Sequence, residues 1–265
     1  MTRTWTPGTP DEALAALART PRLLIALDFD GTASEFAVDP MSARAVPGVA
    51  AAVDRLAALP ETRVAYVSGR SMQHLRIIVE HGDHSPIALA GSHGAEYWLP
   101  GAGAADPVDT PEDAALRESV WAGIAQLLAA YPGIRFERKT YGVGIHSRGA
   151  DPVVAEQAFA AVDAYMAEDA PQWRRRTGNE ILEFSSQTAG KDAAIARLRA
   201  SFDATAVLFA GDDTTDEDAL RVMGPGDLGV RVGAGETAAS LRVADPTEMG
   251  ELLAALADER RARRE

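Results

Sequence analysis

The chain has 265 residues, of which 46% are hydrophobic and 25% charged, a composition typical of a globular protein with a hydrophobic core. Its net charge of −13 disfavours nucleic acid and anionic membranes as partners, and the absence of cysteine excludes disulfides, thiolate zinc sites and cysteine nucleophiles. No apolar run has the length of a signal peptide or a membrane span, so we expect a cytoplasmic protein.

The first hundred residues alternate short apolar runs with helical patterns. The segment Thr9–Glu12 predicts a helix start, with Thr9 as the capping residue and a proline in the first turn. The apolar runs that follow are short and continuous, which is typical of parallel strands buried on both faces. They lie at 23–27, 64–67 and 87–90, with helical patterns at 49–59 and 72–80 between them.

This alternation stops near residue 100. Residues 100–111 are rich in glycine, alanine, proline and aspartate, which predicts a linker. Helices are then expected at 112–130 and 153–168, and strands of alternating polarity at 134–138, 143–147, 173–176 and 180–184. We interpret residues 107–187 as an α+β domain inserted into a core domain made of residues 1–106 and 188–265.

The parallel pattern resumes after the insertion, with a helix at 193–202, a strand at 206–210 and a further strand at 228–232. The last helix begins at Asp245, and its basic end at 260–264 is interpreted as a solvated helix terminus. The predicted fold class is α/β, a doubly wound parallel-sheet core with an inserted α+β cap domain.

The strongest chemical signal is Asp28-Phe29-Asp30-Gly31-Thr32, directly after the first apolar run. Open α/β sheets bind ligands at the carboxyl ends of their strands, where these two carboxylates would lie. Gly31 would allow the chain to turn there without strain. The alternative is an ordinary turn at a strand end, because aspartate and glycine are common turn residues.

A second acidic segment, residues 211–218, follows the strand at 206–210 and contains five carboxylates. Such a cluster repels itself unless a cation or solvent offsets the charge, and a solvated acidic loop is the alternative. If this strand and the first one are neighbours, Asp28, Asp30 and Asp212 converge at one edge of the sheet. Oxygen ligands of this kind favour Mg²⁺.

Two further segments could bind an anion. Ser68, Gly69 and Arg70 end the second strand and offer a hydroxyl and backbone N–H groups near a helix start. Lys191 opens the helix after the insertion and could supply a fixed positive charge. Taken alone, each has an ordinary alternative, a Ser-Gly turn and a surface lysine.

These four segments, in chain order, resemble the motifs of the haloacid dehalogenase (HAD) superfamily, and the resemblance covers essentially the whole chain. It implies a Rossmann-like core and a phosphatase that forms a phospho-aspartate. The implied roles are as follows: Asp28 is the nucleophile and Asp30 the general acid/base; Asp28, the carbonyl of Asp30, and Asp212 hold Mg²⁺; Ser68, Gly69, Arg70 and Lys191 bind phosphate; and Thr32, Asp213 and Asp216 orient these groups.

Within the superfamily, the chain resembles the trehalose-6-phosphate phosphatases, which are also of the type with a large α+β cap. The resemblance rests on GDDxTDE at 211–217, GxHGxE at 91–96, ExK…HxR at 137–148 and GNxxxE at 178–183. It implies that the substrate is trehalose 6-phosphate. The implied substrate-binding residues are His93, Gly94, Glu96, Lys139, His146, Arg148, Asn179 and Glu183.

Several alternatives remain open. The segment 185–189 departs from the family pattern, so the substrate could be another sugar phosphate, such as a sucrose, mannosylglycerate, hexose or trehalose-like pseudo-disaccharide phosphate. A phosphomutase and a sugar-phosphate sensor are also compatible with the fold. His93 could equally be a structural histidine. The expected partners are a small sugar phosphate and Mg²⁺, without nucleic acid or membrane, and the expected state is a monomer.

Overall fold

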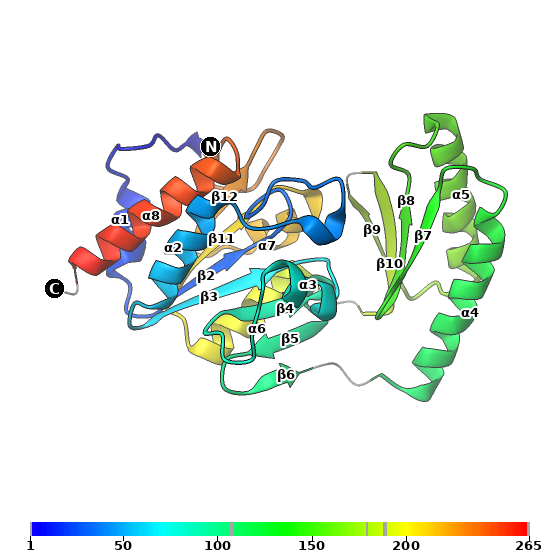
Figure 1. Ribbon diagram of the computed structural model, residues 1–265, viewed down its shortest axis with the longest axis horizontal. Helices are drawn as coiled ribbons and strands as arrows, with labels where there is room; N and C mark the ends of the chain where they lie inside the picture. The colour runs from blue at the N-terminus through cyan, green and yellow to red at the C-terminus, as the bar shows by residue number, and fades with distance from the viewer. Residues whose placement is uncertain (1, 106–108, 179, 188–189, 264–265) are drawn as a thin grey trace. The chain divides into compact units, whose positions relative to one another are not determined.

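The computed structural model describes residues 2–105, 109–178, 180–187 and 190–263. The chain divides into two compact units, one made of Met1–Asp106 and Ala189–Glu265 and the other of Pro107–Thr188 (Figure 1). We call the first the core unit and the second the cap unit. In the described residues, no helix combines the length and the apolar character that crossing a membrane requires.

The core unit contains a nine-stranded sheet in the order β1-β13-β12-β11-β2-β3-β4-β5-β6. In this spatial order, all strands from β1 across to β4 are parallel to their neighbours. The last two strands, β5 and β6, pair antiparallel at one edge of the sheet. The strands are β1 Arg3–Thr4, β2 Leu23–Leu27, β3 Thr62–Val67, β4 Ala88–Gly91, β5 Glu96–Leu99, β6 Gly103–Ala105, β11 Ala206–Gly211, β12 Leu228–Val232 and β13 Leu241–Val243.

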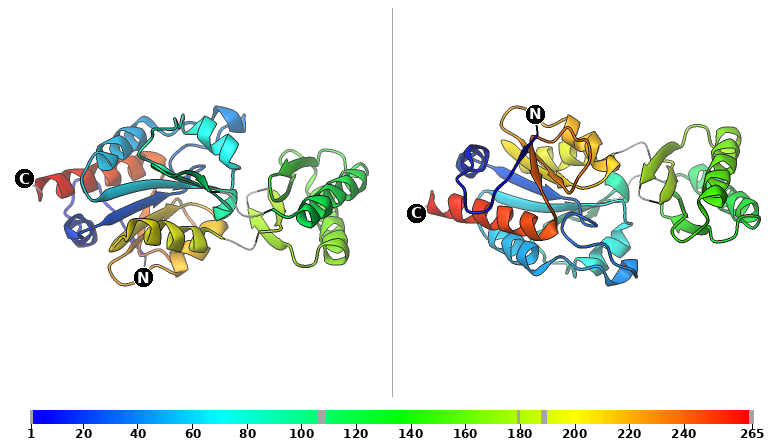
Figure 2. Two further views of the ribbon diagram at one scale, coloured as in Figure 1. Left: turned by 90° about the horizontal axis from the view of Figure 1, so that it is seen from below. Right: turned by 90° about the horizontal axis from the view of Figure 1, so that it is seen from above.

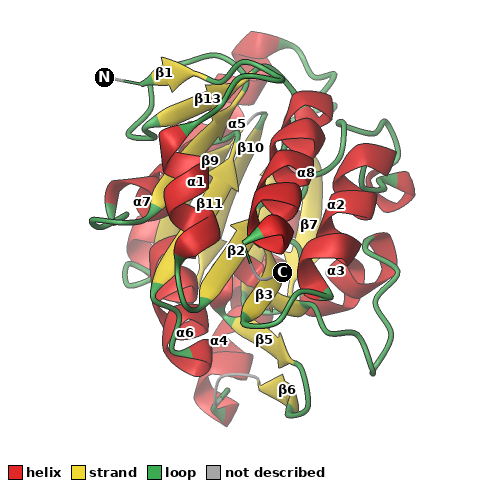
Figure 3. Cartoon of the chain, turned by 90° about the vertical axis from the view of Figure 1, so that its left-hand side faces the viewer, coloured by secondary structure: helices red, strands yellow, loops and turns green. Residues whose placement is uncertain are grey.

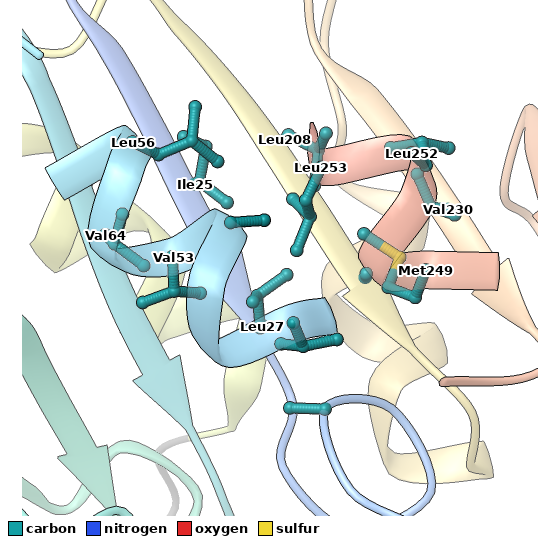
Figure 4. Close-up of a cluster of buried hydrophobic side chains, with 14 of the residues drawn as sticks. Ile25, Leu27, Val53, Leu56, Val64, Leu208, Val230, Met249, Leu252 and Leu253 are labelled. Carbon is teal, nitrogen blue, oxygen red and sulfur yellow. The ribbon is translucent and has the colours of Figure 1, made fainter. Parts of the chain in front are cut away.

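Helices cover both faces of this sheet (Figures 2 and 3). They are α1 Glu12–Arg19, α2 Pro47–Ala57, α3 Met72–Ile78, α6 Lys191–Phe202, α7 Glu217–Arg221 and α8 Pro246–Ala262. Side chains of α1, α2, α3 and α8 pack with Ile25 and Leu27 of β2, whereas those of α6 and α7 pack with Leu24 and Ala26. Figure 4 shows the first of these clusters, in which Val53 and Leu253 belong to helices. Because β2 is buried on both faces, its sequence is continuously apolar.

The cap unit consists of an antiparallel sheet in the order β7-β8-β10-β9 and two helices. Its elements are α4 Pro111–Leu128, β7 Arg135–Lys139, β8 Gly142–His146, α5 Pro152–Asp169, β9 Arg174–Gly178 and β10 Ile181–Ser185. Apolar residues of alternate positions, such as Val143, Ile145 and Leu182, pack with the helices. The intervening positions therefore lie on the opposite face of the sheet, which the helices do not cover.

The predicted α/β fold class is confirmed, and every strand and helix expected from the sequence occurs within about two residues of its expected bounds. Three expectations were wrong. The first helix is capped by Asp11, whose carboxylate accepts the N–H groups of Ala13 and Leu14, and not by Thr9, whose hydroxyl donates to the carbonyl of Thr6. The expected linker contains β6, which pairs with β5.

The third error concerns the basic end of α8, because Arg260 is fully buried. This residue continues the apolar face of the helix, four positions after Leu256. Its guanidinium donates to the hydroxyl of Thr62 at 2.7 Å and to backbone carbonyls that include those of Thr20 and Glu61. Arg260 thus joins the last helix to the loops before β2 and β3, while Arg261 and Arg263 remain exposed as expected.

Candidate active site

The polar segments predicted from the sequence meet at one edge of the core sheet. Asp28, Ser68 and Asp212 follow β2, β3 and β11 directly. These strands are adjacent and parallel, with Leu27 paired to both Tyr66 and Ala210. Their carboxyl ends therefore open at the same level, which is where open α/β sheets bind ligands.

Lys191 lies between two carboxylates at this edge. It is the first residue of α6, and its Nζ lies 2.6 Å from Oδ1 of Asp28 and 2.6 Å from Oδ1 of Asp216. Its side chain is only 3% exposed. Desolvation acts to lower the pKa of Lys191, but the charges of Asp216 and Asp28 outweigh it and raise the pKa. The two ion pairs therefore favour the positively charged form of Lys191 inside the site.

Asp216 is fully buried and fixes the backbone of the acidic loop, residues 211–218. One carboxylate oxygen accepts a hydrogen bond from the Lys191 ammonium. The other accepts hydrogen bonds from the backbone N–H groups of Asp212 and Asp213, at 3.1 and 3.0 Å. A methyl group on Gly211 would lie 2.2 Å from Asp216 Cγ, so glycine is required for this close approach. The loop is held in place by Asp216, which leaves Asp212 at the site.

The carboxylates of Asp28, Asp212 and Asp216 each offer an oxygen, and these oxygens lie within 4.8 Å of one another. Burial is the largest reason why the pKa of Asp28 is raised well above its usual value, and the charges of Asp216 and Asp212 raise it further against the effect of Lys191. Burial and Asp216 likewise raise the pKa of Asp212 to about 6. Two buried carboxylates and the partly buried Asp212, beside one lysine, form a site whose negative charge a divalent cation would offset.

This donor set fits Mg²⁺, which prefers oxygen ligands and is usually held by one or two carboxylates. Both oxygens of Asp216 already accept protein hydrogen bonds, so Asp28 and Asp212 are the carboxylates best placed to ligate a metal. Thr32 orients the second of them, because its hydroxyl donates to Asp212 Oδ1 at 3.0 Å.

Gly31 allows the loop after β2 to pass close to the side chain of Asp212. Its φ is +82°, a conformation that other residues adopt only with strain. A methyl group here would also lie 2.2 Å from Asp212 Oδ2 and 2.7 Å from the ring of Phe36. The glycine of the DxDGT segment is therefore required both by the turn and by the packing against the acidic loop.

Asp30 and Arg70 form a bidentate ion pair, which the sequence alone did not indicate. Arg70 Nε and a terminal guanidinium nitrogen lie 2.7 and 2.6 Å from the two carboxylate oxygens of Asp30. The backbone N–H of Arg70 also donates to the hydroxyl of Ser68 at 3.2 Å. The residues expected to bind phosphate are thus joined to the expected general acid. The sequence did show that Asp30 and Arg70 each follow a predicted parallel strand. Because the carboxyl ends of parallel strands lie at the same edge of a sheet, the two residues could have been expected to lie near each other.

The GxHGxE segment lies in the core unit, where it begins at the end of β4, forms a tight turn at Ser92–Gly94 and continues into β5. His93 and Glu96 are buried. The carboxylate of Glu96 accepts the N–H of Met72 at 3.0 Å and the hydroxyl of Ser92. The bond to Met72 joins the segment to the start of α3, and backbone bonds from Ser92 and His93 join it to the Ser68–Arg70 loop.

In the cap unit, Lys139, His146 and Glu183 lie on the sheet face that the helices leave uncovered, together with Glu137. Lys139 is ion-paired with Glu183, and His146 lies 2.7 Å from Glu137. Desolvation acts to raise the pKa of Glu137, but the bond from His146 and the charge of Lys139 lower it overall. These four side chains form a polar network that we call the cap face.

The remaining predicted cap residues differ from this group. Arg148 follows β8, is about half exposed, and lies 3.2 Å from the carboxylate of Glu180. Asn179 lies outside the described residues.

Two residues of the core site were not among the predicted site residues. Glu217 is buried, accepts the N–H of Ala238 at 2.8 Å, and lies 3.5 Å from Arg231. Arg231 donates to the carbonyl of Asp213 at 3.1 Å. Together they join the acidic loop to the segment after β12. Glu217 belongs to the GDDxTDE segment and could have been noted, whereas no local pattern distinguishes Arg231.

The sequence model of the family described as trehalose-phosphatase matches residues 26–247. The trehalose-phosphate phosphatase of Mycobacterium marinum is 32% identical over 272 residues, covering 94% of this chain and 66% of that protein. That of Mycobacterium tuberculosis is 33% identical over 257 residues, covering 91% and 62%. The chain therefore spans slightly less than two thirds of the length of these relatives.

Solved structures show the same fold. The C-terminal domain of Candida albicans trehalose-6-phosphate phosphatase superposes with a TM-score of 0.80 at 21% identity, covering 97% of this chain and 99% of that chain. A trehalose-6-phosphate phosphatase related protein superposes with a TM-score of 0.73 at 23% identity, covering 91% and 100%. Since the family match extends over most of the chain and includes all four core segments, this protein belongs to the trehalose-phosphatase family.

Proposed function

We propose that this chain is a Mg²⁺-dependent phosphatase that hydrolyses trehalose 6-phosphate through a phospho-aspartate on Asp28. Family membership and the activity named for the mycobacterial relatives support the reaction and the substrate. The observation that carries the mechanism is the position of Asp28 at the end of β2, hydrogen-bonded to the buried cation Lys191. A nucleophilic carboxylate needs a fixed orientation and a positive charge near the attacked phosphoryl group.

In the first step, a carboxylate oxygen of Asp28 forms a bond to phosphorus while the bond between phosphorus and the sugar oxygen breaks. Asp30 gives its proton to that leaving oxygen. Lys191, the Ser68 hydroxyl and the N–H groups of its loop compensate the negative charge on the phosphoryl oxygens. Phosphate-monoester hydrolysis is among the slowest uncatalysed reactions, so dividing it into two steps is advantageous.

In the second step, Asp30 takes a proton from water, the water oxygen bonds to phosphorus, and the bond to Asp28 breaks. Phosphate leaves, and Asp30 is again protonated. The ion pair with Arg70 competes with that proton for the same carboxylate oxygens. We propose that Arg70 leaves Asp30 when phosphate binds and then contacts a phosphoryl oxygen, so that the carboxyl group becomes available for proton transfer.

Asp28, Asp212 and the backbone carbonyl of Asp30 would hold the Mg²⁺, with Thr32 and Asp216 maintaining the position of Asp212. When bound, the metal supplies positive charge next to the transferring phosphoryl group. It also keeps Asp28 ionised, which matters because burial otherwise raises the pKa of this carboxyl group.

The cap face is proposed to recognise the sugar. Lys139 and Glu183 are charged groups able to hydrogen-bond hydroxyls, and they are brought together by the pairing of β7, β8 and β10. A methyl group on Gly144, which lies between them in the sheet, would lie 3.0 Å from Lys139 Cε. This glycine therefore leaves the lysine room to lie across the face. Binding energy from the sugar can assist the chemical step when it is realised in the transition state.

The decisive experiment is to measure phosphate release by the purified chain from trehalose 6-phosphate, with and without Mg²⁺. A parallel panel contains sucrose, hexose and mannosylglycerate phosphates, and Asp28→Asn is the control for contaminating phosphatases. We expect Mg²⁺-dependent release with a preference for trehalose 6-phosphate. A preference for another member of the panel would contradict the substrate, and equal release by Asp28→Asn would contradict the phospho-aspartate.

A further inference from the structure

The backbone turn between β4 and β5 has an unusual conformation. Three consecutive residues, Ser92, His93 and Gly94, have φ values of 48°, 55° and 95°. Serine and histidine rarely adopt this left-handed region, which is strained for residues other than glycine. A conformation of this kind persists only where the surrounding contacts require it, so its contacts indicate its role.

The turn is bonded to both ends of the Ser68–Arg70 loop. The N–H of His93 donates to the carbonyl of Ser68 at 2.9 Å, and the N–H of Ser92 donates to the carbonyl of Arg70 at 2.6 Å. Between these two bonds, the imidazole of His93 lies against Gly69, where a methyl group would be only 2.6 Å from the ring. The loop is therefore held at three successive residues.

Glu96 connects the turn to the start of α3, beyond the loop. Its buried carboxylate accepts the N–H of Met72 at 3.0 Å and also accepts the hydroxyl of Ser92. Met72 is the first residue of α3, and only the capping residue Ser71 separates it from the loop. One carboxylate thus joins the strained turn to the chain on the far side of the loop.

The turn also contacts the helix that carries Lys191. A methyl group on Gly94 would lie 2.8 Å from Cβ of Ala194 and 3.2 Å from the carbonyl oxygen of Gly190. Gly190 is the residue before Lys191, and Ala194 lies one turn further along α6. The absence of a side chain at Gly94 therefore allows the start of this helix to approach the turn closely.

We propose that the turn Ser92–Gly94 and Glu96 are a positioning element for the phosphoryl-binding groups and not a contact to the sugar. This inference rests on the proposed function and deepens it. The element sets the Ser68–Arg70 loop and the start of α6 relative to each other. It thereby determines where the Ser68 hydroxyl and the Lys191 ammonium meet the phosphoryl group. His93 and Glu96 are its positioning residues, because they act through the loop.

The test compares Glu96→Ala with Glu96→Gln on two substrates, trehalose 6-phosphate and phenyl phosphate, which carries no sugar. Glutamine keeps a carbonyl oxygen able to accept from Met72 and Ser92, whereas alanine leaves both donors without this acceptor. Loss of a positioning contact should reduce kcat by roughly 10–10²-fold for Glu96→Ala. The reduction should be similar for both substrates, inorganic phosphate should inhibit more weakly, and Glu96→Gln should retain most activity. A loss confined to trehalose 6-phosphate, or an equal loss in both variants, would overturn the proposal.

A second pair of variants tests the same element without removing a buried carboxylate. In Gly69→Ala, the added methyl group collides with the His93 ring, and Gly69→Ala/His93→Ala removes the obstacle. We expect the double variant to hydrolyse phenyl phosphate faster than Gly69→Ala alone. Losses that simply multiply in the double variant would show that the ring does not press on the loop.

These measurements separate the inference from the proposed function. If the wild-type chain hydrolysed phenyl phosphate but not trehalose 6-phosphate, the proposed substrate would fail, and the phenyl phosphate comparisons would still test the turn. If it hydrolysed neither, the proposed function would fail. The affinity for inorganic phosphate, measured by calorimetry, should then still fall in Glu96→Ala and be retained in Glu96→Gln, and an unchanged affinity in Glu96→Ala would overturn the positioning role.

Discussion

Replacing Lys191 by methionine should destabilise the core unit strongly, because it removes the cation between two buried carboxylates. Asp28 and Asp216 each lie 2.6 Å from its Nζ, and the side chain of Asp216 is fully buried. Removing one partner from a buried ion pair costs about 3–5 kcal/mol, because the remaining charge stays desolvated and uncompensated. For a domain of this size class, 1 kcal/mol corresponds to about 2–4 °C in Tm. We therefore expect a decrease of roughly 6–20 °C.

The assay is thermal unfolding followed by circular dichroism and calorimetry, without added metal. Lys139→Met is a matched control, because Lys139 is the only other lysine of the chain and belongs to the cap unit. This control should leave the unfolding of the core unit nearly unchanged. Lys191→Met/Asp216→Asn should regain part of the lost stability, since it removes one of the two uncompensated charges.

Activity should follow a different pattern from stability. Lys191→Met should lower kcat by about 10²-fold or more, and the double variant should not recover it, because the cation that faces the phosphoryl group is still missing. A single variant that melts within about 2 °C of the wild type, less than 1 kcal/mol on this scale, would refute the buried-charge reasoning.

Further predictions concern catalysis, the metal and the cap face. Asp28→Asn and Asp30→Asn should each reduce turnover, measured as phosphate release, by several decades, and the losses of the two single variants should not be additive in the double variant. Near-normal activity in Asp28→Asn would exclude Asp28 as the nucleophile. EDTA should inactivate the enzyme, Mg²⁺ should restore it, and Ca²⁺ should bind but inhibit because its coordination shell is looser; full activity after exhaustive chelation would contradict the metal site. Lys139→Ala or Glu183→Ala should reduce kcat/KM for trehalose 6-phosphate by roughly 10²-fold and leave phenyl phosphate nearly unaffected. Equal losses on both substrates would exclude sugar recognition by the cap face. Gly31→Ala should abolish Mg²⁺ activation, measured by metal titration, because its methyl group would overlap Asp212.

The strands and helices could be predicted from the sequence because their signals are local. A continuous apolar run such as Leu23–Leu27 indicates a strand buried on both faces. Alternation at 143–147 predicted a half-exposed strand, and the strand forms at Gly142–His146, but its glycines are buried. Capping residues are similarly local, and Asp245 was placed correctly before α8. Thr9 was not, because two possible caps lie two residues apart and only the folded chain selects Asp11.

The chemical segments were also visible in the sequence, since carboxylates that directly follow apolar strands must lie at a sheet edge. These carboxylates converge only because β11 is the neighbour of β2, and the sequence alone could not establish that the two strands are neighbours. The contact between Lys191 and Asp28 joins residues 163 positions apart. No periodic pattern encodes such a distance.

Only the tertiary structure decided how the charged groups pair. The sequence suggested Arg70 as an anion-binding residue, but the parallel alignment of β2 and β3 places its guanidinium on Asp30. The basic end of α8 suggested a solvated terminus, but Arg260 is buried against backbone carbonyls. A long polar side chain carries no local sign of its burial. Its environment is set by the elements that pack around it, and desolvation and partner geometry then determine which charge it meets.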